Sequence, residues 1–130
     1  MTTHPNVELM NQVYAAFTRG DLEAAAGFWT PDCIHYYPGR GPLSGSHQGI
    51  ESAISFATKM FELTQGRIEM VVDEVGASDN YAFALVDTKY ERDGKKLQMK
   101  FVNVSRIEDG KIAEFWTYPE DQYAVDEFWS

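Results

Sequence analysis

The spacing of the apolar residues changes once along this 130-residue chain, at Gly66, and this change constrains the fold more than any other feature. Before Gly66, apolar residues recur every three or four positions in the segments 7–19, 22–29 and 50–64, which is the spacing of amphipathic helices. Thr30-Pro31-Asp32 is expected to stop the second of these helices. After Gly66, apolar and polar residues alternate as in half-buried strands. The sequence therefore predicts helices first and a sheet afterwards.

Two Asp-Gly pairs, Asp93-Gly94 and Asp109-Gly110, separate the later alternating segments. Asp-Gly between two such segments is a strong signal of a tight β-hairpin. Helices followed by an antiparallel meander define the α+β class. The strands are expected over the segments 67–75, 81–92, 96–107 and 111–118.

The segment 33–49 lies between the second and third expected helices and holds two of the three histidines and the only cysteine. Residues 33–37 are expected to form a short strand. Because successive side chains of a strand point to opposite faces, His35 and Tyr37 share one face with Cys33. The rest of the segment contains four glycines and two prolines, which predict a turn-rich loop leading into the third helix.

Composition excludes several classes of function. Asp and Glu total 20 against 11 Lys and Arg, and the resulting net charge of −9 disfavours a protein that follows nucleic-acid phosphates. The single cysteine, Cys33, excludes an internal disulfide and fits a reducing cytosol. No apolar run is long enough to span a bilayer, and Met1–Asn6 lacks the pattern of a leader peptide. We expect one cytoplasmic domain over residues 1–130, without nucleic-acid or membrane partners.

The expected sheet carries large apolar side chains on both of its faces. The chain's own helices can cover one face, but Phe83, Leu85, Phe115 and Trp116 spread apolar character over both. An uncovered apolar face predicts a homodimer through the outer side of the sheet. The acidic segment 119–130 also contains several aromatic residues, so we expect it to pack against the rest of the protein.

Three stretches of the chain carry a resemblance to a known superfamily. They are the helical opening from Gly20-Asp21 to Trp29-Thr30-Pro31-Asp32-Cys33, the helix start Gly45-Ser46-His47-Gln48-Gly49-Ile50-Glu51, and the ending Arg106-Ile107-Glu108-Asp109-Gly110-Lys111-Ile112-Ala113-Glu114-Phe115-Trp116. These stretches resemble the nuclear transport factor 2-like superfamily, and more narrowly its SnoaL-like group, related to polyketide cyclases and ketosteroid isomerases. The resemblance implies a cone-shaped, curved antiparallel or mixed sheet around three N-terminal helices, a deep pocket between them, and usually a dimer. It does not choose a function, because the superfamily includes isomerases, cyclases, dehydratases, epoxide hydrolases and proteins without catalysis.

The catalytic residues of the ketosteroid isomerases do not carry over to this chain. Tyr37 stands where those isomerases have their general-base aspartate, and Val13, one residue before Tyr14, stands at their oxyanion-hole tyrosine. Asn103 replaces the aspartate that they keep protonated. Scytalone dehydratases, which are similar in fold, use a pocket asparagine near the Asn103 position, but their histidines have no clear match on the later strands. The Asp-Arg-Asp set of limonene-epoxide-hydrolase-like members is not evident either.

His35, Tyr37 and Asn103 are the candidate catalytic residues. A histidine in the implied pocket could transfer a proton near neutral pH, or it could be a structural, hydrogen-bonded histidine. The Tyr37 hydroxyl could donate a hydrogen bond to a carbonyl or enolate oxygen, or it could pack at the rim of the pocket. An amide among apolar neighbours needs a partner, so Asn103 contacts either a ligand or another core group.

Other candidates have both a functional and a plainer interpretation. His47 could guard the mouth of the pocket or cap the third helix, and Arg40 could contact an anionic or carbonyl group or lie in solvent. Alternation places Asp87 on the outer face, opposite Val86. The candidate substrate-binding residues are Tyr14, Phe17, Trp29, Arg40, His47, Phe56, Met60, Val86, Phe101, Phe115, Trp116, Tyr118, Phe128 and Trp129.

No metal and no cofactor is expected. The histidines lack an i,i+4 pair, and Gly39-Arg40-Gly41 leads into Pro42 instead of into a helix that could bind a dinucleotide phosphate. A buried, unreactive Cys33 is expected in place of a nucleophile.

Three functional hypotheses follow. The first is a cofactor-independent enzyme that cyclises, isomerises or dehydrates a hydrophobic carbonyl compound of polyketide- or steroid-like size, with His35 transferring the proton and Tyr37 and Asn103 stabilising an enolate. The second is a non-catalytic homodimer that binds a small hydrophobic molecule in the same pocket, which the absence of a carboxylate at Tyr37 favours. The third is a dimerisation module without a pocket.

Overall fold

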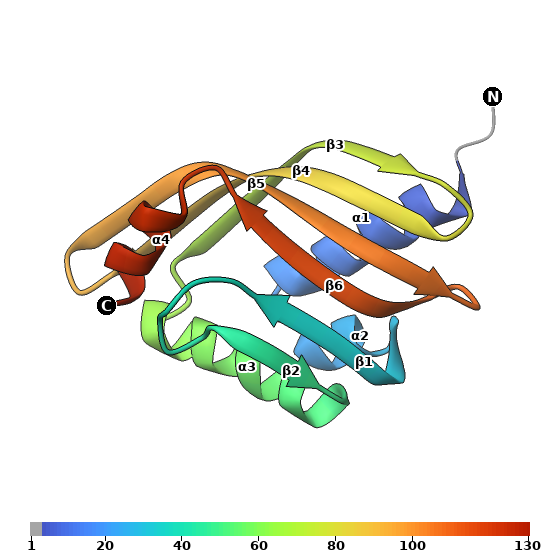
Figure 1. Cartoon of the computed structure of the whole chain (residues 1–130), viewed down its shortest axis with the longest axis horizontal. Coiled ribbons are helices and arrows are strands. Elements are labelled where there is room, and N and C mark those ends of the chain that lie inside the picture. Colours follow the sequence, from blue (N-terminus) through green and yellow to red (C-terminus); the bar gives the residue numbers. More distant parts are fainter. Residues whose placement is uncertain (1–3) are drawn as a thin grey trace.

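The structure, a computed structural model, describes residues 4–130. These residues form four helices and one six-stranded sheet that curves around α1 and α3 (Figure 1). No helix in this part of the chain is long and apolar enough to cross a membrane. The elements in chain order are α1 (Pro5–Thr18), α2 (Leu22–Ala26), β1 (Trp29–Tyr37), β2 (Gly45–Gln48), α3 (Ile50–Thr64), β3 (Ile68–Ala77), β4 (Tyr81–Arg92), β5 (Lys95–Glu108), β6 (Lys111–Pro119) and α4 (Gln122–Trp129).

The strands lie side by side in the order β2-β1-β6-β5-β4-β3. Neighbouring strands are antiparallel except β1 and β6, which are parallel, so the sheet is mixed. Helix α1 packs against β3 and β4, and α3 packs against β1 and β2. The α+β class is confirmed: helices fill the inner side of a curved sheet, and within residues 4–130 no helix covers its outer side.

The predicted meander of β3 to β6 is confirmed, together with both hairpin turns. Asp93 and Gly94 have φ angles of 48° and 78°, and Asp109 and Gly110 have 51° and 75°. Two consecutive left-handed residues form the type I′ turn, whose twist matches that of the flanking strands. Aspartate tolerates this conformation and glycine adopts it freely, so these dipeptides determine where the strands reverse.

The second helix is shorter than the sequence predicts. α2 ends at Ala26, and residues 29–32, expected at the end of the helix and in its stop signal, belong to β1. The reason is tertiary pairing, because the Ile112 N–H donates to the Phe28 carbonyl oxygen (2.8 Å) and Trp29 pairs with Ile112 of β6. The prediction of a helix over 22–29 was therefore wrong in its last three residues.

The loop expected after Tyr37 contains a strand that the sequence did not predict. β2 pairs antiparallel with β1, with His47 directly opposite His35. Its residues are short or polar and mostly exposed, so no apolar alternation reveals it. The backbone of β1 supplies the hydrogen-bonding edge that makes this segment a strand.

The last segment forms α4, as expected for a tail that packs against the protein. Asp121 caps the helix by accepting a hydrogen bond from the Ala124 N–H (3.2 Å). Phe128 and Trp129 are almost fully buried and contact Tyr90 of β4, with the Phe128–Tyr90 and Trp129–Tyr90 ring centroids 5.9 Å and 5.4 Å apart. The final residues therefore form part of the core at one end of the sheet.

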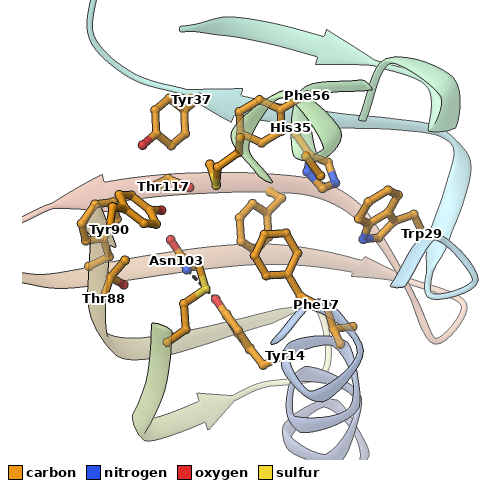
Figure 2. Close-up of a pocket in the computed structure, with 16 residues that line it drawn as sticks. Tyr14, Phe17, Trp29, His35, Tyr37, Phe56, Thr88, Tyr90, Asn103 and Thr117 are labelled. Carbon is orange, nitrogen blue, oxygen red and sulfur yellow. Dashed lines mark hydrogen bonds between the residues drawn. The ribbon is translucent and has the colours of Figure 1, made fainter. Parts of the chain in front are cut away.

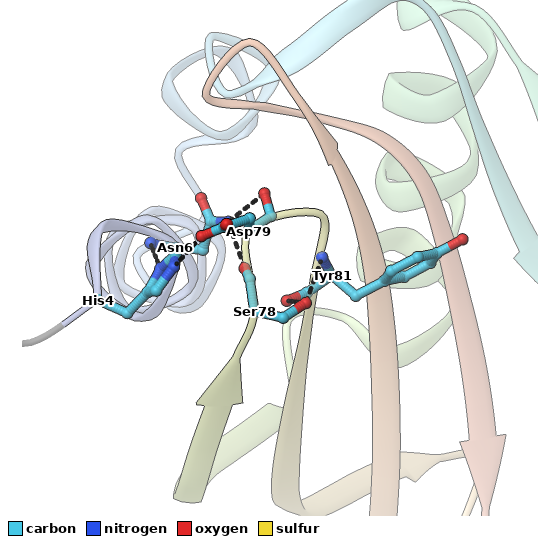
Figure 3. Close-up of polar contacts among 5 residues, drawn as sticks. All are labelled: His4, Asn6, Ser78, Asp79 and Tyr81. Carbon is cyan, nitrogen blue, oxygen red and sulfur yellow. Dashed lines mark hydrogen bonds and ion pairs between the residues drawn. The ribbon is translucent and has the colours of Figure 1, made fainter.

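The start of α1 is fastened to the β3–β4 turn (Figure 3). The buried Asn6 side chain donates hydrogen bonds to the carbonyl oxygens of Ser78 (2.8 Å) and Asp79 (3.2 Å). The His4 ring contacts the Asp79 carboxylate (3.1 Å) and accepts from the Asn6 N–H (3.1 Å). This contact sets the angle at which α1 enters the curve of the sheet.

Replacing Asn6 by alanine is expected to lower the free energy of unfolding by about 1–3 kcal/mol, because the Asn6 amide is buried and makes two hydrogen bonds to the β3–β4 turn, which the substitution removes. Urea denaturation followed by circular dichroism measures the change. Asn11→Ala, an exposed asparagine on the same helix, is the control and should change stability by less than about 0.5 kcal/mol. Equal effects of the two substitutions would contradict the structural role of Asn6.

Candidate functional site

A cavity lies between the inner face of the sheet and helices α1 and α3 (Figure 2). The volume that the centre of a water molecule can occupy in it is about 70 Å³, which is room for a few water molecules. Its walls are mainly aromatic and aliphatic, and they contain no Asp, Glu, Lys or Arg. The lining residues are Val13, Tyr14, Phe17, Trp29, His35, Tyr37, Phe56, Ala57, Met60, Met70, Thr88, Tyr90, Phe101, Asn103, Phe115 and Thr117.

The structure brings the three candidate catalytic residues together at this cavity. His35 and Tyr37 come from the inner face of β1, and Asn103 comes from β5 (Figure 2). Cys33 shares the inner face of β1 but is buried in the core beside the cavity and does not line it. Of the candidate substrate-binding residues, Tyr14, Phe17, Trp29, Phe56, Met60, Phe101 and Phe115 line the cavity.

Two candidate substrate-binding residues, Trp116 and Tyr118, lie on the opposite face of the sheet. Phe115 and Thr117 occupy the inner positions of β6, so strand alternation turns Trp116 and Tyr118 outward. Trp116 stacks on Tyr36 with their ring centroids 5.3 Å apart. Neither residue can reach a ligand in this cavity.

Three further candidates are buried without lining the cavity. Val86 packs in the main core with residues of α1, although it lies on the inner face of β4. Phe128 and Trp129 pack behind Tyr37 and Tyr90 in the second core cluster. These side chains support the walls of the cavity from behind.

Arg40 and His47 also lie outside the cavity. Arg40 is exposed, and its backbone N–H donates to the Asp126 carboxylate of α4 (3.0 Å). His47 lies on β2, where its Nε2–H donates to the Leu43 carbonyl oxygen (2.8 Å). Its ring stacks on Phe56, with centroids 4.4 Å apart, on the outer side of the cavity wall.

The His35 imidazole is buried between aromatic rings. Its centroid lies 4.5 Å from that of Trp29 and 5.2 Å from that of Phe115, and its Nε2 has no hydrogen-bond partner among the described residues. Burial, and secondarily the neighbouring His47, lower the pKa of His35 from 6.5 to about 4. The ring is therefore neutral at physiological pH, and its Nε2 is available to a ligand.

Acidification is expected to destabilise the protein through His35. Between pH 6.5 and about 4 the unfolded chain binds a proton at this residue that the folded chain does not, so the free energy of unfolding falls as the pH drops. The shift corresponds to a loss of about 3 kcal/mol by pH 4. Urea denaturation at pH 7 and pH 4 should show a correspondingly smaller loss for His35→Gln than for the wild-type protein. Parallel pH dependences would contradict the buried, neutral state of His35.

Tyr14 and Asn103 form a hydrogen-bonded pair at the floor of the cavity. The Asn103 Nδ2–H donates to the Tyr14 hydroxyl oxygen, which leaves the hydroxyl hydrogen of Tyr14 free to be donated. The Asn103 Oδ1 has no partner among the described residues. Burial raises the pKa of Tyr14 well above its usual value, so the phenol keeps its proton. The pair thus offers the cavity one donor and one acceptor.

A second polar group consists of Tyr37 and its neighbours. The Trp129 indole N–H donates to the Tyr37 hydroxyl oxygen (3.0 Å), and Tyr37 therefore has its own hydrogen to donate. Burial raises the pKa of Tyr37 to about 12. Tyr90, whose pKa is also raised by burial, lines the same end of the cavity. Both phenols stay protonated under physiological conditions.

Sequence reasoning missed three polar lining residues, Thr88, Tyr90 and Thr117. Thr88 and Tyr90 have the same parity as Val86 along β4, and Thr117 has the same parity as Phe115 along β6. Strand alternation could have placed them on the inner face. Alternation could not have shown that the cavity extends along the sheet as far as Tyr90 and Thr117.

No cluster of three or more His, Cys, Asp or Glu side chains that could hold a metal ion occurs among residues 4–130. The polar groups that face the cavity are an imidazole, an amide and hydroxyls. Such a set binds an uncharged ligand by hydrogen bonds, and its one basic side chain is that of His35.

Comparison with known proteins places this fold in a family. The sequence model of the SnoaL-like domain matches residues 10–115. An uncharacterized protein of Mycobacterium tuberculosis is 24% identical over the full length of both chains. The solved structure of Bal32a, from a soil-derived mobile gene cassette, is 28% identical, covers 97% of each chain and superimposes with a TM-score of 0.93. A candidate SnoaL-like polyketide cyclase from Jannaschia is 21% identical, with 97% of this chain and 92% of that chain covered and a TM-score of 0.82. This protein belongs to the SnoaL-like family and has the nuclear transport factor 2-like fold.

Proposed function

We propose that the protein is a cofactor-independent acid–base enzyme that acts on a hydrophobic carbonyl compound of polyketide- or steroid-like size. The observation that carries this proposal is the His35 imidazole, which is buried, neutral and without a partner at Nε2 among the described residues, in a mainly apolar cavity. A buried nitrogen without a hydrogen-bond partner costs free energy and is therefore rare in folded proteins. A ligand that pairs with it, or a catalytic role, would explain why it is kept. The name of the Jannaschia relative agrees with this class of reaction.

In the proposed reaction the His35 Nε2 takes a proton from the carbon next to the substrate carbonyl. The electron pair of that C–H bond moves to the carbonyl oxygen and forms an enolate. The hydroxyls of Tyr37 and Tyr14 donate hydrogen bonds to this oxygen, and Asn103 holds the Tyr14 hydroxyl in place. The enolate then recovers the proton at another, conjugated carbon, attacks a second carbonyl whose oxygen takes the proton from His35, or expels a β-hydroxyl group that leaves with the proton as water. These outcomes are isomerisation, cyclisation and dehydration.

The low pKa of His35 is compatible with this role. The general-base aspartate of ketosteroid isomerase has a pKa of only about 4.6, and it still removes a proton from carbon. His35, with a pKa of about 4, has a similar basicity and is unprotonated at physiological pH. The raised pKa values of Tyr37 and Tyr14 keep the donors protonated over the same range.

Exchange of α-hydrogens for deuterium tests the proposal without knowledge of the natural substrate. The ketone 2-tetralone is incubated with the protein in D₂O at neutral pD, and the loss of its α-proton signals is followed by NMR. We expect faster exchange than with the same concentration of free imidazole, together with binding measurable by calorimetry. Binding without accelerated exchange would contradict catalysis of this kind.

A non-catalytic, ligand-binding protein is the second candidate. It is favoured by the absence of a carboxylate from the cavity wall, and by Tyr37 at the position where the isomerases have their base. Such a protein would bind 2-tetralone and leave its exchange rate unchanged.

We also propose that the protein forms a homodimer through the outer face of the sheet. That face holds a hollow lined by Tyr81, Phe83, Val102 and Val104, and Phe83 is 46% exposed. A second copy would bury these side chains. The proposal predicts that Phe83→Asp weakens the dimer by about a hundredfold, because a carboxylate would be buried without a partner.

Sedimentation velocity across a range of protein concentrations measures this effect. Tyr123→Asp is the control, since Tyr123 lies on α4, away from the sheet face, and is 89% exposed. A wild-type protein that stays monomeric at all concentrations would contradict the dimer.

A further inference from the structure

A surface groove adjoins the cavity, and the Phe56 ring is the wall that the two share. The groove runs between β2, with the connection before it, and the adjacent side of α3. Water centres can occupy about 430 Å³ of the groove, against about 70 Å³ of the cavity. Phe56 lines both spaces and is only half-buried (Figure 2).

The small volume of the cavity, compared with that of the groove, limits how a ligand can be bound. The cavity beside His35 is too small for a whole molecule of polyketide or steroid size. The remainder of such a molecule must leave the cavity. The groove beyond Phe56 is the adjoining space with enough volume to receive it.

The groove differs from the cavity in chemistry. Ser52 and Lys59 lie at i and i+7 of α3, with Phe56 between them at i+4, so the three side chains follow one face of the helix. Ser55 adds a second hydroxyl to the groove wall, and the Glu51 carboxylate lines the same groove toward the start of the helix, two turns from Lys59. The Lys59 ammonium forms no ion pair within residues 4–130. Next to Phe56, the groove therefore presents hydroxyl and ammonium donors.

His47 holds the Phe56 ring from the groove side. Its Nε2–H is used by the Leu43 carbonyl oxygen, and its ring is nearly parallel to Phe56, with an interplanar angle of 21°. Phe56 also contacts Tyr37, with ring centroids 5.4 Å apart. The shared wall is thus one aromatic side chain, packed between His47 on the groove side and Tyr37 on the cavity side.

We propose that the groove is a second part of the ligand site and binds an oxygen-rich, hydrogen-bond-accepting tail, such as a carboxylate, of a ligand whose apolar ring occupies the cavity. Lys59 and the serines of α3 bind the tail, and Phe56 lies at the junction between ring and tail. This assignment rests on the proposed function in that it places the reacting ring beside His35. Beyond the proposed function, the assignment states the chemical nature of the tail, which is the part of the substrate that does not react.

Three ring-matched probes test the proposal by calorimetry at low salt: 2-methoxynaphthalene without a tail, 4-(2-naphthyloxy)butan-1-ol with a neutral tail, and 4-(2-naphthyloxy)butanoate with an anionic tail. The butanoate is expected to bind more tightly than the tailless probe, although the net charge of −9 repels anions overall. Lys59→Gln should lower the affinity for the butanoate by about fivefold and leave that for the tailless probe unchanged.

Lys111→Gln is the matched control, because it removes the same charge at the exposed β5–β6 turn. Equal affinities of the three probes for the wild-type protein, or equal losses in the two lysine variants, would overturn the proposal. Nuclear Overhauser contacts give a second measurement: the ring protons should contact His35 and the tail methylenes should contact Phe56 and His47.

The result can be separated from that of the deuterium-exchange assay. The naphthyl probes carry no ketone and undergo no proton transfer, so they report on binding alone. A tail preference that Lys59→Gln removes, without catalysed exchange of 2-tetralone, would support the groove and reject the enzyme. Catalysed exchange without a tail preference would support the enzyme and reject the groove as part of the ligand site.

Discussion

Replacing His35 by glutamine is expected to lower the protein-catalysed rate of α-hydrogen exchange by about 10²–10⁴-fold, the usual contribution of a positioned acid–base group. Glutamine fills most of the space of the imidazole but has no atom that can accept a proton near neutral pH. His35 is the basic side chain that lines the cavity, and its Nε2 has no hydrogen-bond partner among the described residues. Affinity for 2-tetralone should change little, because the aromatic walls remain.

The pH dependence sharpens this prediction. His35 is unprotonated above its pKa of about 4, so the catalysed rate should be nearly constant from pH 5 to pH 8 and should fall as the pH approaches 4. Cys33→Ala is the control, since Cys33 shares the inner face of β1 but does not line the cavity. An exchange rate in His35→Gln equal to that of the wild-type protein would assign the proton transfer to another group.

Deleting Asp126–Ser130 is expected to unfold most of the protein at room temperature. The deletion removes Phe128 and Trp129, each 2% exposed, from the cluster that packs against Tyr90. Truncating one buried Phe or Trp to Ala costs about 3–5 kcal/mol, and removing both approaches the total stability of about 5–15 kcal/mol of a typical domain. Far-ultraviolet circular dichroism and urea denaturation measure the loss.

Two point substitutions separate the contribution of the Trp129–Tyr37 hydrogen bond from the effect of removing an exposed ring on α4. Trp129→Phe keeps most of the ring but removes the hydrogen bond to Tyr37, and it should cost about 1 kcal/mol. Tyr123→Ala removes an exposed ring from the same helix and should cost less than about 0.5 kcal/mol. A truncated protein with the wild-type unfolding midpoint and undiminished affinity for 2-tetralone would show that α4 supports neither the core nor the cavity.

The order of the elements could be predicted because it depends on residues that are close in sequence. Three-to-four-residue spacing marked α1 and α3, and alternation with two Asp-Gly turns marked β4, β5 and β6 to within a residue or two. The same alternation placed His35 and Tyr37 on one face of β1. Periodicity and turn chemistry act over a few residues, so a sequence displays them directly.

What depends on pairing between distant segments could not be predicted in this way. Residues 29–32 joined β1, and β2 formed at all, because neighbouring strands offered backbone hydrogen-bonding partners there. The predicted ligand contacts of Trp116 and Tyr118 failed because the inner parity of β6 belongs to Phe115 and Thr117.

The sequence by itself determined the α+β class, the family resemblance and the inner face of β1. The tertiary structure alone decided that the site is a mainly apolar cavity into which a few polar groups project. Tyr14 and Asn103 are 89 positions apart, and Tyr37 and Trp129 are 92 positions apart, yet each pair shares a hydrogen bond. The curvature of the sheet brings these residues together, and that curvature results from the packing of all the strands and helices at once.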